Sequence, residues 1–159
     1  MMTQRTHIQT TNGQSRSFLS DRFNPYRAAI HRMLGLLDGT ERWSYTLERA
    51  LNPDDIASID HAERSHSFLQ AGGAADRLAL EVRYVEDDGK ERQYAVGKPG
   101  GQYSGDPTET VIIGGNEFHV YPDEVFTADE ATDVFYGYFQ NDRVPEQYPL
   151  RRLDFSAYE

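Results

Sequence analysis

The sequence predicts an α+β domain with N-terminal helices, an antiparallel meander sheet of about five to six strands, one long C-terminal helix packed on the sheet and a final strand. Three observations predict this class. Apolar residues recur at helical spacing over residues 30–37 and again over 131–139, while residues 77–85 alternate apolar and polar side chains. Helices that precede and follow a run of strands, rather than alternating with them, are typical of α+β folds.

The first 20 residues are polar, rich in Thr, Ser and Gln, and show no apolar period. A segment of this composition has too little apolar surface to offset the entropy of ordering it. We therefore expect residues 1–20 to form a disordered tail. A chain of 159 residues is of a size for one hydrophobic core, so we expect residues 21–159 to form a single α+β domain.

The first predicted helix follows Asn24-Pro25, an N-cap residue with proline at the first helical position. Its apolar side chains are spaced at i, i+3, i+4 and i+7, and Gly39 ends it. They are Ile30, Met33, Leu34 and Leu37.

Two further helices are expected before the strands. Thr40 is a possible cap for one over residues 40–51, with Trp43, Leu47 and Ala50 on its apolar side. Asn52-Pro53 repeats the start signal, and the apolar pattern after it fades, which predicts a short helix.

The strands are predicted from residue 64 onward. Residues 77–85 have one apolar face, and Asp88-Gly89 is a hairpin turn into residues 91–97. Residues 108–114 and 117–121 flank Gly115-Asn116 as a second hairpin. Residues 64–70 predict another strand before an Ala71-Gly72-Gly73 turn, and residues 150–155 predict the last one.

The C-terminal helix has the most complete set of signals. Thr127 and Glu130 form a capping box, and Phe126 is placed to pack on Ala131. An apolar stripe at helical spacing places the helix on a core. The stripe consists of Ala131, Val134, Phe135, Tyr138 and Phe139.

The formal charge of −10 is unevenly distributed. Residues 1–76 contain 8 basic and 9 acidic side chains, and residues 77–159 contain 8 basic and 17 acidic ones. An acidic surface repels phosphate backbones and anionic membranes and attracts cations. We therefore expect no nucleic-acid or membrane partner, and a cationic protein partner instead.

Several function classes lack their signatures. The chain has no cysteine, and its longest apolar runs are too short to cross a bilayer, so we expect a cytoplasmic protein. The Gly-rich segment 97–105 lacks the spacing of a phosphate-binding loop. We expect no catalytic residues, no cofactor and no metal site.

The candidate partner-binding residues are acids and tyrosines in the acidic half, because tyrosine is favoured at protein interfaces. Helix capping alone explains Asp129, whereas Asp133 adds a like charge one turn later. The full set is Asp129, Asp133, Tyr136, Asp142, Asp123, Glu124, Tyr103, Asp87 and Asp88.

The C-terminal third resembles the type-one immunity protein family, which is associated with deaminase toxins of bacterial polymorphic toxin systems. The resemblance depends on Glu130-Ala131 opening a helix that carries Phe135 and Phe139, followed by the polar turn 141–143, Pro145 and the closing strand 150–155. The hairpin YVEDDGKERQYAVG fits the family's meander. The family's Trp in the last strand is missing, since Trp43 is the only tryptophan.

The resemblance implies a cytoplasmic protein that binds a cognate toxin, possesses no catalysis of its own and occludes the toxin's active site. Two alternatives stay open. One is a small-molecule-binding or hydrolytic domain with a pocket between helix and sheet, and the other is an adaptor or chaperone of a secretion system.

Overall fold

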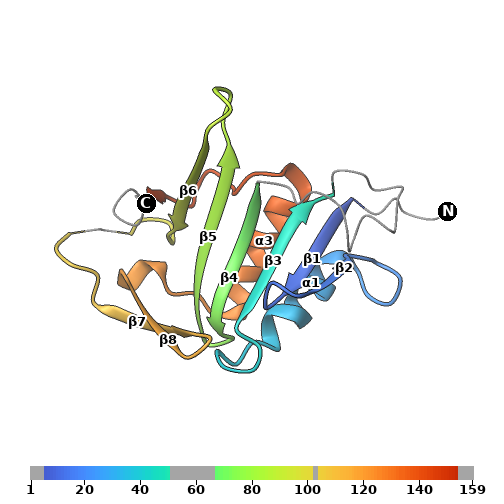
Figure 1. Ribbon diagram of the computed structural model, residues 1–159, viewed down its shortest axis with the longest axis horizontal. Helices are drawn as coiled ribbons and strands as arrows, with labels where there is room; N and C mark the ends of the chain where they lie inside the picture. Colours follow the sequence, from blue (N-terminus) through green and yellow to red (C-terminus); the bar gives the residue numbers. More distant parts are fainter. Residues whose placement is uncertain (1–5, 51–66, 102–103, 154–159) are drawn as a thin grey trace.

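The computed structural model describes residues 6–50, 67–101 and 104–153, and its architecture is α+β, as predicted (Figure 1). Seven antiparallel strands form the main sheet in the order β2-β1-β3-β4-β5-β6-β9. Their bounds are β1 His7–Thr11, β2 Ser15–Phe18, β3 Ser44–Arg49, β4 Phe68–Ala74, β5 Arg77–Val85, β6 Glu91–Val96 and β9 Leu150–Arg152.

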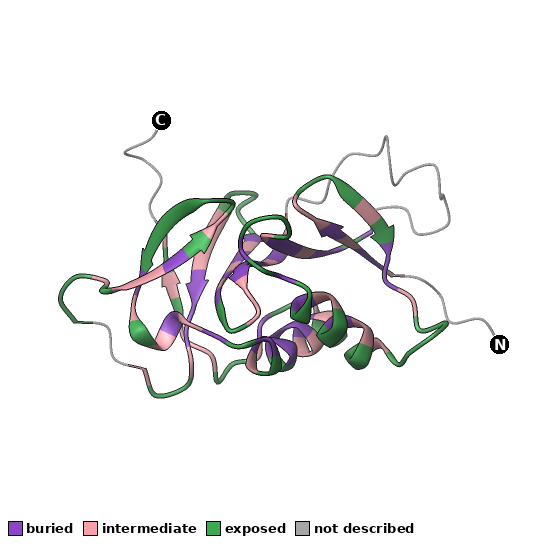
Figure 2. Ribbon diagram, turned by 90° about the horizontal axis from the view of Figure 1, so that it is seen from below, coloured by how far each residue is buried: buried purple, intermediate pink, exposed green. Residues whose placement is uncertain are grey.

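Helices α1 (Tyr26–Gly35) and α3 (Ala128–Asn141) lie side by side on one face of this sheet, with their exposed residues turned away from it (Figure 2). The core lies between the helices and the sheet. It includes Tyr45, Leu80 and Phe135, each at most 1% exposed. The ring centroids of Tyr45 and Phe135 are 5.5 Å apart, so the helix packs directly on β3.

The expectation of a disordered tail over residues 1–20 is wrong, because residues 7–18 form the hairpin β1–β2. Three residues, 12–14, connect the paired residues Thr11 and Ser15, and Asn12 and Gly13 have positive φ angles of 54° and 68°, which suit a tight hairpin turn. β1 also pairs along its length with β3. These polar strands are stabilised by long-range backbone pairing, which a search for apolar periodicity does not detect.

The helix expected over residues 40–51 is also wrong, since residues 44–49 form β3 between β1 and β4. Tyr45 and Leu47 point to the same side of the strand and are fully buried in the core. The segment therefore alternates as a strand does, and its pairing with two neighbours outweighs the helical spacing of Trp43, Leu47 and Ala50. The short helix expected after Asn52-Pro53 lies outside the described residues.

Other observed element boundaries differ from the predicted ones by a few residues. α1 has Pro25 rather than Asn24 at its N-cap and ends at Gly35, before Gly39. β4 runs through Ala71-Gly72-Gly73, where a turn was expected. A Cβ on Gly72 would lie 2.8 Å from the Ile113 side chain, so the glycine allows a second layer to approach the strand.

That second layer is a separate two-stranded sheet of β7 (Glu109–Ile113) and β8 (Asn116–Val120), at the lower left of Figure 1. It confirms the predicted hairpin, but the turn is Gly114-Gly115 rather than Gly115-Asn116, because Asn116 already pairs with Ile113. A short 3₁₀ helix, η1 (Pro122–Glu124), follows β8. The chain then pairs with the start of β5, where Leu78 and Phe126 exchange two backbone hydrogen bonds of 2.8 Å.

α3 begins where it was predicted to begin. The Glu130 backbone N–H donates to Thr127 Oγ1 at 3.2 Å, and the Thr127 N–H donates to the Glu130 carboxylate at 2.9 Å. This is the predicted capping box. The predicted final strand is confirmed over residues 150–152, which pair with β6.

Candidate partner-binding site

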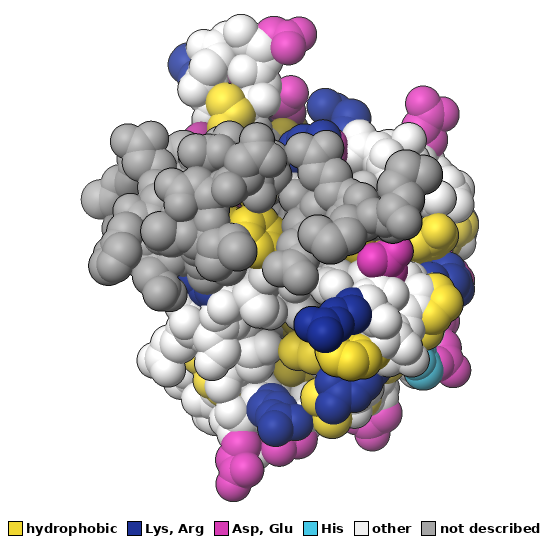
Figure 3. All heavy atoms as spheres, turned by 90° about the vertical axis from the view of Figure 1, so that its right-hand side faces the viewer, with side chains coloured by type: hydrophobic (Ala, Val, Ile, Leu, Met, Phe, Trp, Pro, Cys, Tyr) yellow, Lys and Arg dark blue, Asp and Glu magenta, His cyan; other side chains and the backbone are white. Residues whose placement is uncertain are grey.

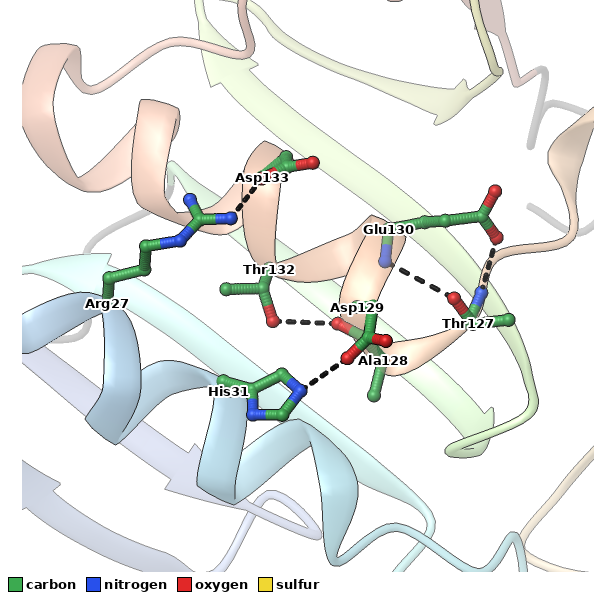
Figure 4. Close-up of polar contacts among 8 residues, drawn as sticks. All are labelled: Arg27, His31, Thr127, Ala128, Asp129, Glu130, Thr132 and Asp133. Carbon is green, nitrogen blue, oxygen red and sulfur yellow. Dashed lines mark hydrogen bonds and ion pairs between the residues drawn. The ribbon is translucent and has the colours of Figure 1, made fainter.

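The exposed acids of α3 contact side chains of α1 (Figure 4). An Asp129 carboxylate oxygen lies 2.5 Å from His31 Nε2, and Asp133 forms an ion pair with the Arg27 guanidinium. Both of these partners belong to α1. The face of α3 that was expected to contact a partner is therefore at least partly a seam between two helices of the same chain.

Asp142 makes similar internal contacts. It caps the C-terminus of α3 in the left-handed region, with φ of 58°. Its two carboxylate oxygens lie 2.8 Å from His7 Nε2 and 3.2 Å from Arg49 Nη1. Burial lowers the pKa of His7, although the hydrogen bond that its imidazole donates to the Asp142 carboxylate opposes this shift.

Glu124 was expected on the surface and is buried at 1% exposure. Its carboxylate accepts two hydrogen bonds of 2.9 Å from the Arg151 guanidinium and one of 3.0 Å from the Tyr121 backbone N–H. These bonds close η1 against the edge strand β9. Neighbouring Asp123 is half-buried, and its backbone carbonyl accepts from the Lys98 N–H at 2.7 Å.

The other candidates are scattered. Tyr136 is half-buried and packs on Phe139, with ring centroids 6.2 Å apart. Asp87 and Asp88 are exposed on the β5–β6 turn, at the top of Figure 1, where a 2.8 Å bond from Arg92 lowers the pKa of Asp88. Tyr103 lies outside the described residues. The structure thus does not gather the eight candidates that lie in its described ranges into one surface.

The excess of acidic over basic side chains is concentrated in a shorter stretch than the second half of the chain. Residues 99–142 contain nine acidic side chains and neither Lys nor Arg. Most of these acids lie against basic side chains from other parts of the chain: Glu109 against Arg77, Glu124 against Arg151, Asp129 against His31, Glu130 against Lys98, Asp133 against Arg27, and Asp142 against His7 and Arg49.

Two exposed acids of this stretch have no side-chain partner within the described ranges. They are Asp106, in the loop before β7, and Glu117, on β8. The Tyr121 hydroxyl donates to the Gly105 carbonyl at 2.8 Å, which ties that loop to the end of β8. A gap in Lys and Arg usage between residues 98 and 143 was visible in the sequence and pointed to this region.

The same hairpin exposes apolar side chains, with Ile112 at 40% and Phe118 at 47% exposure. All of β8 from Asn116 to His119 is exposed. We define the hairpin surface as Asp106, Ile112, Glu117, Phe118 and His119. Acidic and apolar groups are thus combined on a hairpin that forms a two-stranded sheet of its own, separate from the main sheet (Figure 1).

The opposite side of the molecule has a different character. Figure 3 shows Lys and Arg side chains interleaved with hydrophobic ones on the side far from the hairpin. In the segment between β2 and α1, the Arg22 guanidinium carbon lies 5.3 Å from the centroid of the Phe23 ring, which is 85% exposed.

The space between α3 and the sheet is filled by core side chains, including Val134 and Phe135 at 0% exposure. An open depression of about 300 Å³ lies instead beside the N-terminus of α3, where Arg77 and Lys98 are already paired with Glu109 and Glu130. In residues 6–50, 67–101 and 104–153, no three acidic or histidine side chains are arranged to hold a metal ion. No helix in these ranges has the length and hydropathy to span a membrane.

Comparison of the chain with protein-family models, curated proteins and solved structures found no match.

Proposed function

We propose that this chain is an immunity-type protein that binds and neutralises a cationic toxin of a polymorphic toxin system in the cytoplasm, without catalysis of its own. The observation that carries the proposal is the hairpin surface. It combines unneutralised carboxylates with exposed Ile112 and Phe118 in the stretch that lacks Lys and Arg. The register pairs Ile112 with Glu117 and Phe118 with Val111, so one exposed apolar side chain lies on each face of the hairpin.

The resemblance to the type-one immunity family supports the same proposal. Its elements occur in the expected order, with Phe135 and Phe139 on α3, a turn containing Pro145 and the closing strand β9. A toxin that acts on nucleic acid, such as a deaminase, has a cationic substrate groove. An acidic inhibitor accelerates association with such a groove and competes with phosphate for it.

Binding to a toxin encoded next to this gene tests the proposal. Co-expression of the chain should rescue growth of cells that produce the toxin domain, and the purified proteins should form a stable complex. Glu117→Lys should slow association by about tenfold at low salt, with a smaller effect at high salt.

Glu146→Lys is the matched control, because it makes the same charge change at another exposed position, in the turn before β9. It should leave the association rate within about twofold of wild type. Failure of the wild-type chain to bind the toxin domain or to rescue growth would overturn the proposed function.

A further inference from the structure

The hairpin connection determines which backbone groups of β8 face outward. Gly114 and Gly115 form a two-residue turn with φ of 60° and 84°, closed by the pair Ile113 and Asn116. In a hairpin of this type the closing pair exchanges both of its backbone hydrogen bonds, and hydrogen-bonded and non-bonded pairs then alternate. Glu117 and His119 belong to non-bonded pairs, so their N–H and C=O groups point away from β7.

The same alternation predicts that the backbone N–H and C=O groups of Thr110 and Ile112 point away from β8. The contacts of their carbonyl oxygens agree with this. The Thr110 carbonyl accepts a 2.7 Å hydrogen bond from Arg77 Nε. A Cβ built on Gly39 would lie 3.0 Å from the Ile112 carbonyl oxygen. The outer edge of β7 is therefore covered by the main body of the protein.

The outer edge of β8 differs, since no strand of the described chain pairs with it. An exposed edge strand is a template for another strand, and proteins often block such edges with proline, lysine or a bulge. β8 has the sequence NEFHV, which contains neither proline nor lysine; its one carboxylate is Glu117, and its register with β7 is continuous. It is an open edge next to an exposed aromatic ring.

We propose that β8 receives an extended, Lys- or Arg-bearing segment of the partner protein as an additional antiparallel or parallel strand. The proposal rests on the proposed function and names the contact by which the toxin is held. Backbone hydrogen bonds from Glu117 and His119 would supply affinity, and the side chains of Glu117 and Phe118 would select a segment that alternates cationic and apolar residues.

Charge complementarity identifies the occupant as a cationic partner rather than a second copy. Each copy has a formal charge of −10, and the exposed acids Glu117, on β8, and Asp106, in the loop before β7, belong to the hairpin surface. Two such edges would repel one another, whereas a cationic segment would be attracted to Glu117 and Asp106.

Residue-resolved amide hydrogen exchange tests the proposal in the full chain, free and bound to the toxin domain encoded beside the gene. The outward amides of Glu117 and His119 should exchange fast in the free chain and at least about tenfold more slowly in the complex. The inward amides of Phe118 and Val120 should be protected in both states, and they serve as an internal control.

A proline scan separates backbone from side chain. His119→Pro removes an outward N–H, which an edge strand tolerates, and should weaken binding by at least about tenfold. His119→Ala retains the N–H and should bind within about twofold of wild type. Glu117→Pro serves as a second backbone variant, and the protected amides of Phe118 and Val120 report whether the hairpin remains folded in each.

The outcomes are distinguishable. If the wild-type chain does not bind the toxin domain, the proposed function falls and strand addition falls with it. If it binds while the amides of Glu117 and His119 exchange as in the free chain, or while folded proline variants bind equally well, only strand addition is overturned. Self-association through β8 in sedimentation experiments without toxin would assign the edge to a second copy and overturn it as well.

Discussion

The imidazole of His7 on β1 lies 2.8 Å from the carboxylate of Asp142 at the end of α3, although 135 positions separate the two residues. His7 is 1% exposed, and its ring centroid is 4.9 Å from that of Phe139. The contact anchors the first described strand to the last helix. It explains why a polar N-terminal segment is ordered.

This contact predicts a pH dependence of stability. Burial lowers the pKa of His7 below its ordinary value of about 6.5, so the unfolded chain binds this proton more tightly than the folded chain. The contribution of His7 is therefore complete above about pH 6.5 and is lost as the pH falls below that value. Urea unfolding at about pH 7.5 and about pH 5.5 should show a smaller stability loss in His7→Gln than in wild type. His119→Gln, at an exposed strand position, is the control, and an unchanged loss in His7→Gln would contradict the prediction.

The ion pair between α1 and α3 should contribute little to the free energy of unfolding. The side chains of Arg27 and Asp133 are 51% and 54% exposed, and exposed ion pairs contribute about 0.2–1 kcal/mol. A double-mutant cycle of Arg27→Ala and Asp133→Ala should give a coupling free energy in this range. An affinity for the toxin that is unchanged in Asp133→Ala would assign this acid to helix packing, whereas a large loss would restore it as a partner contact.

Glu124 should contribute far more to stability than the exposed acids. Its buried carboxylate accepts from Arg151 and from the Tyr121 backbone, and hydrogen bonds to charged groups contribute roughly 1.5–3 kcal/mol. Glu124→Gln should lower the free energy of unfolding in denaturant by about this amount. Glu146→Gln, at an exposed position, should change it by less than about 0.5 kcal/mol. Equal effects of the two substitutions would show that the buried pair does not stabilise η1.

Gly73 should tolerate no side chain. Its φ is +119°, and a Cβ there would lie 2.4 Å from the Arg77 carbonyl oxygen and 2.8 Å from Val111 Cγ1. Gly73→Ala should destabilise the protein by more than the roughly 1–3 kcal/mol expected from backbone strain alone. Gly89→Ala isolates that strain, because Gly89 has φ of +78° and no atom near its Cβ position. Thermal unfolding of both variants gives the comparison, and a Gly73→Ala loss no larger than that of Gly89→Ala would exclude a clash with β7.

Local sequence signals correctly predicted those helices and strands whose conformation depends on residues within the same segment. The capping box of Thr127 and Glu130 correctly predicted the start of α3, and alternation correctly predicted β5. The segments that failed depend on distant partners. β1 and β2 carry little apolar character, and β3 has apolar residues that also fit a helix, so only pairing within the sheet determines their conformation.

The candidate site shows the same contrast between local signals and contacts with distant residues. The sequence shows where the acids are. When α3 is considered alone, Asp129, Asp133 and Asp142 are predicted to form an unpaired acidic face. Their basic partners come from β1, α1 and β3, which are more than 90 positions away in the chain. Neither Glu117 nor Phe118 was a candidate, since nothing local distinguishes an open edge strand from a paired one.

The sequence by itself determined the α+β class, the start of α3, the β5–β6 and β7–β8 hairpins and the acidic character of the second half. Capping, alternation and turn chemistry act between residues a few positions apart, which is why they can be recognised in the sequence. Only the tertiary structure decided which acids are neutralised and which strand edge remains open. Charge pairing and strand pairing depend on distances in space between residues that are remote in the chain.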